Sequence, residues 1–397
     1  MRRLLFFAGV LVAAGVFGAA TQSGSVVSDW DLLRKIVLVP GISGQERKLS
    51  DFVQGALPSS LKAQRDAKGD VWFTVGDGRP YIFFVAHMDE LGFVVDKITP
   101  QGMVQLKPGG GLLPQACEAR PFVIHTAKGP VEGIIQPRPD YYRSPGAAAG
   151  RGAVRTGPPG GPTTTASSGN QNPSGSQPQA TVAAEILEVY LGVSTEAEAR
   201  ALGVAEGNPV IFKKRIVDLT PDIMAARAVD DRAGCAAVLA AALRIDWAKI
   251  RAKKVTFAWS VQEETGLFGA QELAKALKPD YVFAVDTFVS TDSPLENKRF
   301  GDAVLGKGAV LRSIDTSNVT PKADINKVAA IAEARGIPIQ IRNSRGGNDG
   351  SVFVVEGAAD IPLSWAGVYA HSFIEKIVRS DLEGLTALIQ AIVEEWK

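Results

Sequence analysis

The sequence is poor in the residues that most often mark a special class of protein. It has 3 His, 2 Cys and 4 Met among 397 residues, and its formal net charge is +1. A nearly neutral chain has no long-range field to attract nucleic acid or an anionic membrane. It also lacks zinc-finger spacing, a Gly-rich phosphate loop and interleaved basic and aromatic residues. These absences argue against a nucleic-acid partner and leave an ordinary globular protein of one large or two moderate domains.

The two cysteines give little information about disulfides. Cys117 and Cys235 could pair if the protein is exported to an oxidising compartment. They lie, however, in what the pattern described below indicates are different structural units. We therefore expect two buried thiols rather than a bridge.

The N-terminus has the pattern of a secretory signal. Arg2 and Arg3 precede an uncharged apolar run from Leu4 to Ala20, and the polar residues 21–25 follow. We predict a signal peptide over residues 1–20, with cleavage near Ala20 and export to the periplasm or the exterior. The alternative is an uncleaved membrane anchor, because an apolar run of this length is at the short limit of a membrane span.

The rest of the chain shows an α/β pattern that a β-rich insert interrupts. Residues 29–57 are predicted to be helical with a break at 40–44, and strands are predicted at 71–75 and 81–86. Short β runs split by Gly and Pro follow from 92 to 135, and another strand is predicted at 209–217, which indicates a small barrel or sandwich. From residue 233 onward strands alternate with helices, so we predict a mostly parallel sheet flanked by helices. The elements predicted there are helices 233–244, 269–277, 323–335 and 382–396 and strands 255–261, 281–285 and 337–341.

This pattern divides the chain into two domains. The catalytic domain is predicted to be discontinuous, over residues 26–92 and 219–397, and the β-rich insert covers residues 93–218. Within the insert, Arg143–Gln179 consists mainly of Gly, Pro, Ser, Thr and Ala, with almost no large apolar residue. Such a composition buries too little surface to offset the entropy of ordering, so we predict that residues 143–180 are disordered.

Imidazole and carboxylate side chains follow one predicted strand after another. In α/β proteins, ligands gather beyond the carboxyl ends of parallel strands, so these side chains are expected to converge on one rim. The residues are His87, Asp89, Asp230, Asp231, Glu263, Glu264, Asp286 and His371.

A cluster of two imidazoles and several carboxylates needs a source of positive charge. Without it the carboxylates repel one another, and several would have to be protonated. Two divalent cations remove that problem, activate a water molecule and polarise a carbonyl at neutral pH. Zinc is the expected metal for mixed His and carboxylate ligands, with cobalt and manganese as alternatives.

The adjacent pair Glu263 and Glu264 suggests a division of labour. Neighbours in an extended segment point in opposite directions, so one can bind metal while the other exchanges a proton with the attacking water and the leaving amine. Asp89 is placed to accept the second imidazole N–H of His87 and so to fix its tautomer.

Each of these residues also has an ordinary explanation. A histidine after a strand is usually a loop residue, a Glu pair is usually solvated surface, and either Asp230 or Asp231 could be a helix N-cap. The functional interpretation is favoured because the ordinary explanations would have to hold at every strand end together. His125 lies outside this pattern and is interpreted as structural or surface. The loop Arg345–Ser351 could be a plain turn or could present backbone N–H groups to a substrate.

Taken together, the motifs resemble the tetrahedral aminopeptidases of peptidase family M42. The resemblance covers nearly the whole chain after the signal, and any one motif is modest evidence. The motifs that carry it, in chain order, are Val39–Gly44, Ala86–Phe93, Val229–Gly234, Val261–Leu267, Val285–Asp286, Gly346–Asp349 and Tyr369–Ser372.

The resemblance implies a two-metal exopeptidase that acts on peptides. Asp230 would bridge the metals, His87 and Asp286 would complete one site, and Glu264 and His371 the other. Glu263 would be the general base and acid, and Asp89 would orient His87. The insert would be a dimerisation or apical domain, and the protein would assemble into a homo-oligomer.

Three features depart from the family pattern. The chain has a predicted export signal, whereas the family is usually cytosolic, and it carries the insertion at 143–180. Val368 stands where the family often has Arg before the Tyr of its last motif.

The leading hypothesis is an exported aminopeptidase. A dipeptidase or N-deacylase with the same two metals is the main alternative. A glucanase-like hydrolase is a weaker one, because glycoside hydrolysis usually uses two carboxylates without a metal. A non-catalytic binding protein is disfavoured because every expected ligand is present.

Overall fold

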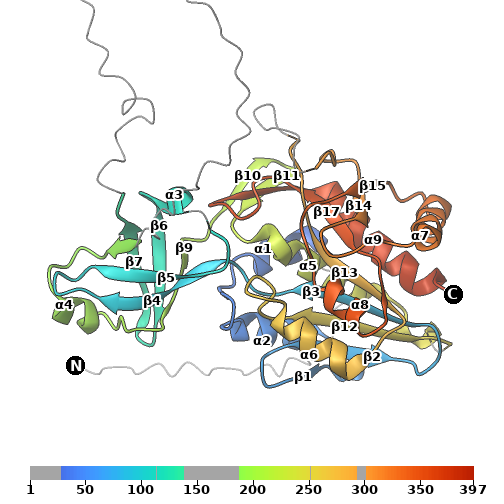
Figure 1. Ribbon diagram of the computed structural model, residues 1–397, viewed down its shortest axis with the longest axis horizontal. Coiled ribbons are helices and arrows are strands. Elements are labelled where there is room, and N and C mark those ends of the chain that lie inside the picture. The colour runs from blue at the N-terminus through green and yellow to red at the C-terminus, as the bar shows by residue number, and fades with distance from the viewer. Residues whose placement is uncertain (1–27, 113, 138–186, 251, 293–300) are drawn as a thin grey trace, which may run out of the picture.

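The computed structural model describes residues 28–112, 114–137, 187–250, 252–292 and 301–397. The predicted signal segment, residues 1–20, and the stretch Arg143–Gln179 lie outside these residues. The described chain forms an α/β unit and a closed β-barrel, which lie side by side in Figure 1. None of its helices is long and apolar enough to cross a membrane.

A large mixed sheet forms the centre of the α/β unit. Its strands follow the order β1-β2-β12-β3-β13-β17-β14-β15, and β16 pairs with β13. The four strands β12, β3, β13 and β17 are parallel neighbours, so their carboxyl ends lie along one edge. The strands are β1 (Gln64–Arg65), β2 (Val71–Val75), β3 (Tyr81–His87), β12 (Lys254–Ser260), β13 (Tyr281–Val289), β14 (Ala309–Ile314), β15 (Ile339–Asn343), β16 (Ala359–Asp360) and β17 (Leu363–Gly367).

Helices cover both faces of this sheet, which is why its central strands are apolar without alternation. In β3, Ile82 and Phe84 pack on the side of α1, α2, α5 and α9, whereas Phe83 and Val85 pack on the side of α6 and α8. The helix α5 is buried almost throughout, as its run of alanines predicts for a helix that is apolar on all sides. The helices are α1 (Asp29–Ile36), α2 (Arg47–Ala56), α5 (Val229–Arg244), α6 (Phe268–Leu277), α7 (Lys322–Ala334), α8 (Gly350–Val355) and α9 (Arg379–Glu395).

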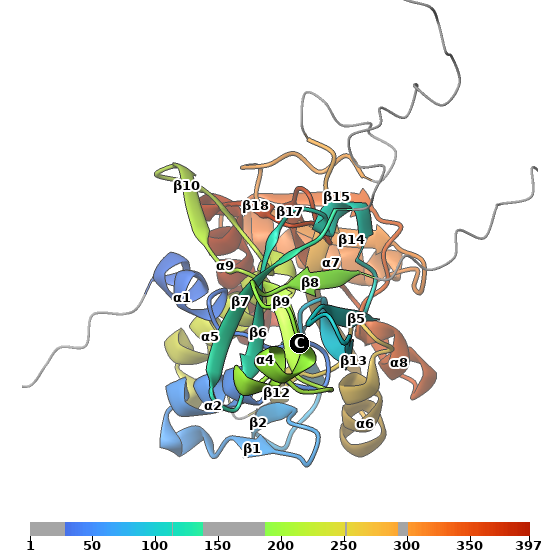
Figure 2. The ribbon, with the colours of Figure 1, turned by 90° about the vertical axis from the view of Figure 1, so that its left-hand side faces the viewer.

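The barrel has a core of its own and faces the viewer in Figure 2. Its strands follow the order β4-β5-β8-β7-β6-β9 around a closed circuit. Phe93, Phe122 and Phe212 meet inside it, with Phe122 and Phe212 ring centroids 4.3 Å apart. The elements are β4 (Gly92–Ile98), β5 (Val104–Gly109), α3 (Pro114–Cys117), β6 (Pro121–Thr126), β7 (Gly129–Ile135), β8 (Glu188–Tyr190), α4 (Glu196–Ala201) and β9 (Pro209–Phe212).

Two short segments connect the barrel to the α/β unit, and a buried ion pair joins them. Glu90 lies on the segment that leads into the barrel, and Lys214 lies on the segment that leads out. Lys214 Nζ is 2.8 Å from Glu90 Oε1 and donates to the carbonyl of Val37. Arg232 is also fully buried, and its Nη2 lies 3.6 Å from the same oxygen, Glu90 Oε1. Beyond the junction, β10 (Ile216–Thr220), β11 (Ile223–Ala226) and β18 (Glu375–Val378) form a small antiparallel sheet.

The predicted architecture is confirmed: a mostly parallel sheet flanked by helices, with a small barrel inserted between its strands. The expectation for the cysteines is also confirmed, because Cys117 and Cys235 are buried and form no disulfide.

The largest differences from the predicted element boundaries are at three places. The single strand predicted at 209–217 is two strands, β9 and β10, because the chain leaves the barrel at residues 213–215, where the buried Lys214 pairs with Glu90. The helix predicted from residue 233 begins at Val229, with non-helical backbone at Asp230 and Asp231. The strand predicted at 281–285 continues to Val289, because it keeps pairing with β17, so Asp286 lies within a strand rather than after one.

Candidate metal centre

The residues predicted to form the site come from separate elements that end at one edge of the sheet. His87 is the last residue of β3, and Asp286 lies in the neighbouring β13. Glu264 follows β12, and His371 follows β17. Asp230 lies in the non-helical first turn of α5, which packs against β3 and β13. The shared edge therefore brings together side chains that are up to 284 residues apart in the chain.

The structure arranges these five side chains as two groups of three, and Asp230 belongs to both. In each group, one nitrogen or oxygen atom per residue lies within 4.8 Å of the others. His87 Nε2 is 3.5 Å from Asp230 Oδ1 and 4.0 Å from Asp286 Oδ1. His371 Nε2 is 3.5 Å from Asp230 Oδ2 and 3.5 Å from Glu264 Oε2. Each oxygen of Asp230 thus faces a different imidazole.

This donor set fits a divalent cation in each group. Imidazole nitrogens and carboxylate oxygens are the usual ligands of zinc, along with thiolates. Asp230 Oδ1 is buried and has no hydrogen-bond partner. An unpaired buried carboxylate oxygen is costly, and a bound cation would satisfy it.

Electrostatics in the metal-free chain show how crowded the charges are. Burial raises the pKa of Glu264 to about 8, and the charge of Asp230 adds to this effect. Burial also raises the pKa of Asp286. The hydrogen bond to Asp230 is the main cause that raises the pKa of His371 to about 9. Protons therefore supply the positive charge that cations would otherwise provide.

Asp230 and Asp231, which the sequence left open, have different roles. The Asp231 carboxylate accepts from the backbone N–H groups of His87 at 3.1 Å and of Gly234 at 3.2 Å. It therefore caps the start of α5 and holds the end of β3. Asp230 is left to face the two imidazoles.

Asp89 lies beside His87, as predicted, but its close hydrogen bonds are to other groups. Its Oδ1 is 3.4 Å from His87 Nδ1, which is long for a hydrogen bond. The same oxygen accepts from Glu263 N at 3.0 Å, and Oδ2 accepts from Glu264 N at 3.1 Å. Asp89 therefore holds the backbone that carries both glutamates.

Glu263 is the second glutamate on this segment. Burial raises the pKa of its carboxyl well above the ordinary value, the charge of His87 opposes that shift, and the charge of Asp286 adds to it. A carboxyl in this setting accepts a proton more readily than an exposed glutamate does.

Several functional residues were not predicted from the sequence. Glu375 is buried and accepts from Asp230 N at 2.9 Å and from Arg227 Nη1 at 2.8 Å. Arg312 is buried with a guanidinium nitrogen 3.5 Å from Asp286 Oδ2. A signal for Arg312 existed, since it is the one charged residue in the run Ala309–Ile314. Nothing comparable marked Glu375.

The loop Arg345–Ser351 is fixed against this edge of the sheet. Arg312 Nη1 donates to the Gly347 carbonyl at 3.0 Å, and Asn348 Nδ2 donates to Asp315 at 2.6 Å. Asp349 is buried and accepts from the hydroxyl of Ser260. The loop is therefore more than a plain turn, and it supports the strand end next to Glu263.

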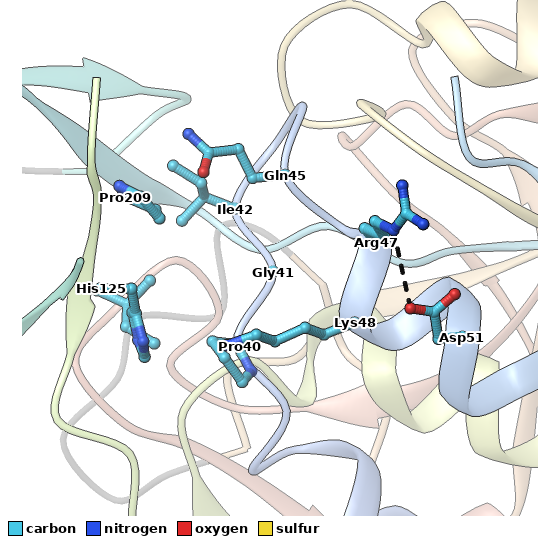
Figure 3. Close-up of a pocket in the computed structure, with 10 residues that line it drawn as sticks. Pro40, Gly41, Ile42, Gln45, Arg47, Lys48, Asp51, His125 and Pro209 are labelled. Atoms are coloured by element: carbon cyan, nitrogen blue, oxygen red, sulfur yellow. Dashed lines mark ion pairs between the residues drawn. The ribbon is translucent and has the colours of Figure 1, made fainter. Parts of the chain in front are cut away.

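The third histidine lies elsewhere, as predicted. His125 is a half-buried residue of β6 that lines a pocket of about 490 Å³ between the barrel and the segment leading into α2. Figure 3 shows this pocket, with Pro40 and Lys48 across from His125. Burial lowers the pKa of His125. No member of either group of three lines the pocket.

Comparison with known proteins agrees with this arrangement. A family described as M42 glutamyl aminopeptidase matches residues 69–153 and 167–388. The lysyl aminopeptidase of Pyrococcus furiosus is 27% identical over 377 residues, covering 93% of this chain and 98% of that protein. The glutamyl aminopeptidase of Lactococcus lactis is 25% identical, covering 86% and 89%. The Pyrococcus horikoshii TET1 peptidase, whose structure is reported as a tetrahedron or a large octahedral shell, is 31% identical with a TM-score of 0.76, covering 93% and 100%.

Because the chain has only 3 His, the electrostatics of the site can be tested by NMR of the imidazole protons in the metal-free protein. We expect His371 to titrate near 9 and His125 below 6.5. The raised pKa means that the His371 contribution to stability is complete below about 6.5 and is lost as the pH rises through 9. His371 titrating at its ordinary pKa would show that Asp230 and Glu264 do not lie beside it in solution.

Proposed function

This chain belongs to the M42 glutamyl aminopeptidase family, and we propose that it removes N-terminal residues from peptides with two divalent cations held at the edge of its sheet. Membership of the family makes it a peptide hydrolase of the aminopeptidase type. The observation that carries the two-cation proposal is the sharing of Asp230, whose two oxygens face the two groups of three donors.

The proposed ligands follow from that geometry. His87 and Asp286 hold one cation, and Glu264 and His371 hold the other, with Asp230 between them. Zinc is the proposed metal because it accepts mixed imidazole and carboxylate ligands, and cobalt or manganese would fit the same donors. When bound, such a pair of cations activates a water molecule and polarises the scissile carbonyl.

Glu263 is the proposed general base and acid. Glu263 directly precedes the proposed ligand Glu264 in the chain, and its raised pKa makes it a stronger proton acceptor than an exposed glutamate. It would take a proton from the attacking water and deliver it to the amine that leaves. Asp89 supports this role because it accepts a hydrogen bond from the Glu263 N–H. Asp89 would also orient the imidazole of His87, which lies beside it.

The comparisons support a homo-oligomer. The TET1 peptidase of Pyrococcus horikoshii, 31% identical to this chain, assembles into a tetrahedron or a shell. The barrel, within the insert at residues 93–218, is the proposed assembly domain. Residues 26–92 and 219–397 together are the proposed catalytic domain. Peptides are the proposed substrates, as the names of the relatives suggest.

The function can be tested with the purified protein before and after metal removal by a chelator. We expect hydrolysis of aminoacyl p-nitroanilides in preference to N-acyl amino acids, loss of activity on chelation, and recovery with zinc, cobalt or manganese. His371→Ala should lose the cation of its group and the activity, whereas His125→Ala, the matched control, should keep both. Elemental analysis measures the cations. Chelator-resistant hydrolysis, or preference for N-acyl substrates, would contradict the proposal.

The role of Glu263 leads to a separate prediction. Glu263→Gln should keep its cations and lower kcat by about 10²- to 10⁴-fold, because the amide takes up no proton. Glu272→Gln, on the exposed surface of α6, is the control and should leave kcat unchanged. An unaltered kcat in Glu263→Gln would remove this residue from the base role.

Export is part of the proposal and rests on the N-terminal sequence, with Arg2, Arg3 and the apolar run that follows. When the full chain is expressed in a bacterial host, we expect to recover the protein outside the cytoplasm. N-terminal sequencing should then give an N-terminus near Thr21. Recovery in the membrane fraction with the segment intact would indicate an anchor. Intact protein in the cytoplasm would contradict export.

A further inference from the structure

Four consecutive backbone N–H groups after β12 are each held by a carboxylate from another part of the chain. Val261 N donates to Asp70 Oδ1 at 2.8 Å, and Gln262 N donates to Glu46 Oε1 at 3.0 Å. Glu263 N and Glu264 N donate to the two oxygens of Asp89, at 3.0 and 3.1 Å. The three carboxylates are almost completely buried. We call this arrangement the carboxylate clamp.

The backbone in this segment needs such support. It has left the sheet, so its N–H groups have no strand partner, and a buried N–H without a partner is unfavourable. Gln262 also has a φ of 57°, a conformation that a residue with a side chain adopts only when its surroundings impose it. Without the clamp, the segment would relax toward a different path.

The clamp is tied to the loop between α1 and α2. Glu46 Oε1, which accepts from Gln262 N, also accepts from Gly44 N at 2.8 Å. The hydroxyl of Ser43 donates to Asp89 Oδ2. This short loop therefore contacts both carboxylates that hold residues 262–264, although it lies more than 200 residues away in the chain.

We propose that Glu46 is a positioning residue that fixes Glu263 and Glu264 relative to each other at the site, and that Ser43 of the same loop assists through its hydrogen bond to Asp89. This inference rests on the roles proposed for those two glutamates. Gln262 directly precedes Glu263, so a shift of its peptide turns the base and the ligand together. Misplacement of a reacting group by about 1 Å can lower a rate by about 100-fold, so modest movement here affects turnover more than substrate binding.

A simpler explanation is that Glu46 satisfies buried N–H groups and stabilises the fold without any particular effect on the reaction. The chain offers a matched control for that explanation. Asp381, at the start of α9, is fully buried and accepts from Gly306 N at 2.7 Å and Gly308 N at 2.8 Å. It has the same chemistry as Glu46 but holds a loop that carries none of the proposed site residues.

The experiment compares Glu46→Ala, Glu46→Gln, Ser43→Ala and Asp381→Ala with the unmodified protein. The measurements are kcat, KM, metal content, Tm and hydrogen exchange of the amides of residues 261–264.

Glu46→Ala should lower kcat by about 10- to 100-fold with KM changed less than about threefold, and should speed exchange at 262–264 by about tenfold or more. Glu46→Gln keeps an acceptor oxygen and should restore most of kcat. Ser43→Ala should show the same pattern more weakly, and it provides the test if Glu46→Ala fails to fold. Asp381→Ala should lower Tm without either effect.

Several outcomes would overturn the proposal. Unchanged exchange at 262–264 in both Glu46→Ala and Ser43→Ala would show that the clamp does not hold this segment. Equal losses of kcat in Glu46→Ala and Asp381→Ala would leave only a general effect on stability. Failure of Glu46→Gln to recover would exclude the acceptor role. If the unmodified protein hydrolyses no peptide, the proposed function fails, and the exchange data still decide whether Glu46 fixes residues 262–264.

Discussion

The position of the Asp230 carboxylate is the constraint on which the rest of the site depends. Its two oxygens lie 3.5 Å from two imidazoles, that of His87 at the end of β3 and that of His371 in the loop after β17. The backbone of Asp230 is held in turn by Glu375, which is paired with Arg227 at 2.8 Å, and Arg227 also donates to the carbonyl of Leu91. Helix, small sheet and barrel junction therefore all contribute to the placement of one side chain. If the Asp230 side chain could rotate, the two groups of three donors would no longer share a residue.

The many acidic residues around this point fall into two groups that the fold treats differently. Asp230, Asp286 and Glu264 face the imidazoles and one another, where their charges need a cation or protons. Asp231, Asp89 and Glu46 instead accept hydrogen bonds from backbone N–H groups, which offset part of the cost of burying a carboxyl group. Burial nevertheless raises the pKa of Asp231 and of Glu46, which limits the negative charge held in this small volume. The division also explains why neighbours in sequence, such as Asp230 and Asp231, have unlike roles.

The sequence allowed the α/β architecture, the barrel insert and the five donor residues to be predicted, because these depend on local patterns. Apolar strands followed by His or acidic residues mark one edge of a parallel sheet wherever the strands pair. Glu375 and Glu46 could not be identified in the same way. Their proposed roles come from tertiary contacts with Asp230 and Gln262, and neither a glutamate at the start of a short strand nor one in a loop has a distinguishing pattern. The boundary at Lys214 was missed because a lysine there resembles an exposed strand residue until its partner, Glu90, is known.

The ion pair at the junction bears on how freely the barrel can move relative to the α/β unit. Glu90 and Lys214 lie on the two crossings between barrel and α/β unit, and Arg232 secures the same carboxylate from below. Swinging the barrel outward would separate desolvated opposite charges, and a buried charge that loses its partner costs about 3–5 kcal/mol. These contacts therefore oppose movement of the barrel away from the α/β unit.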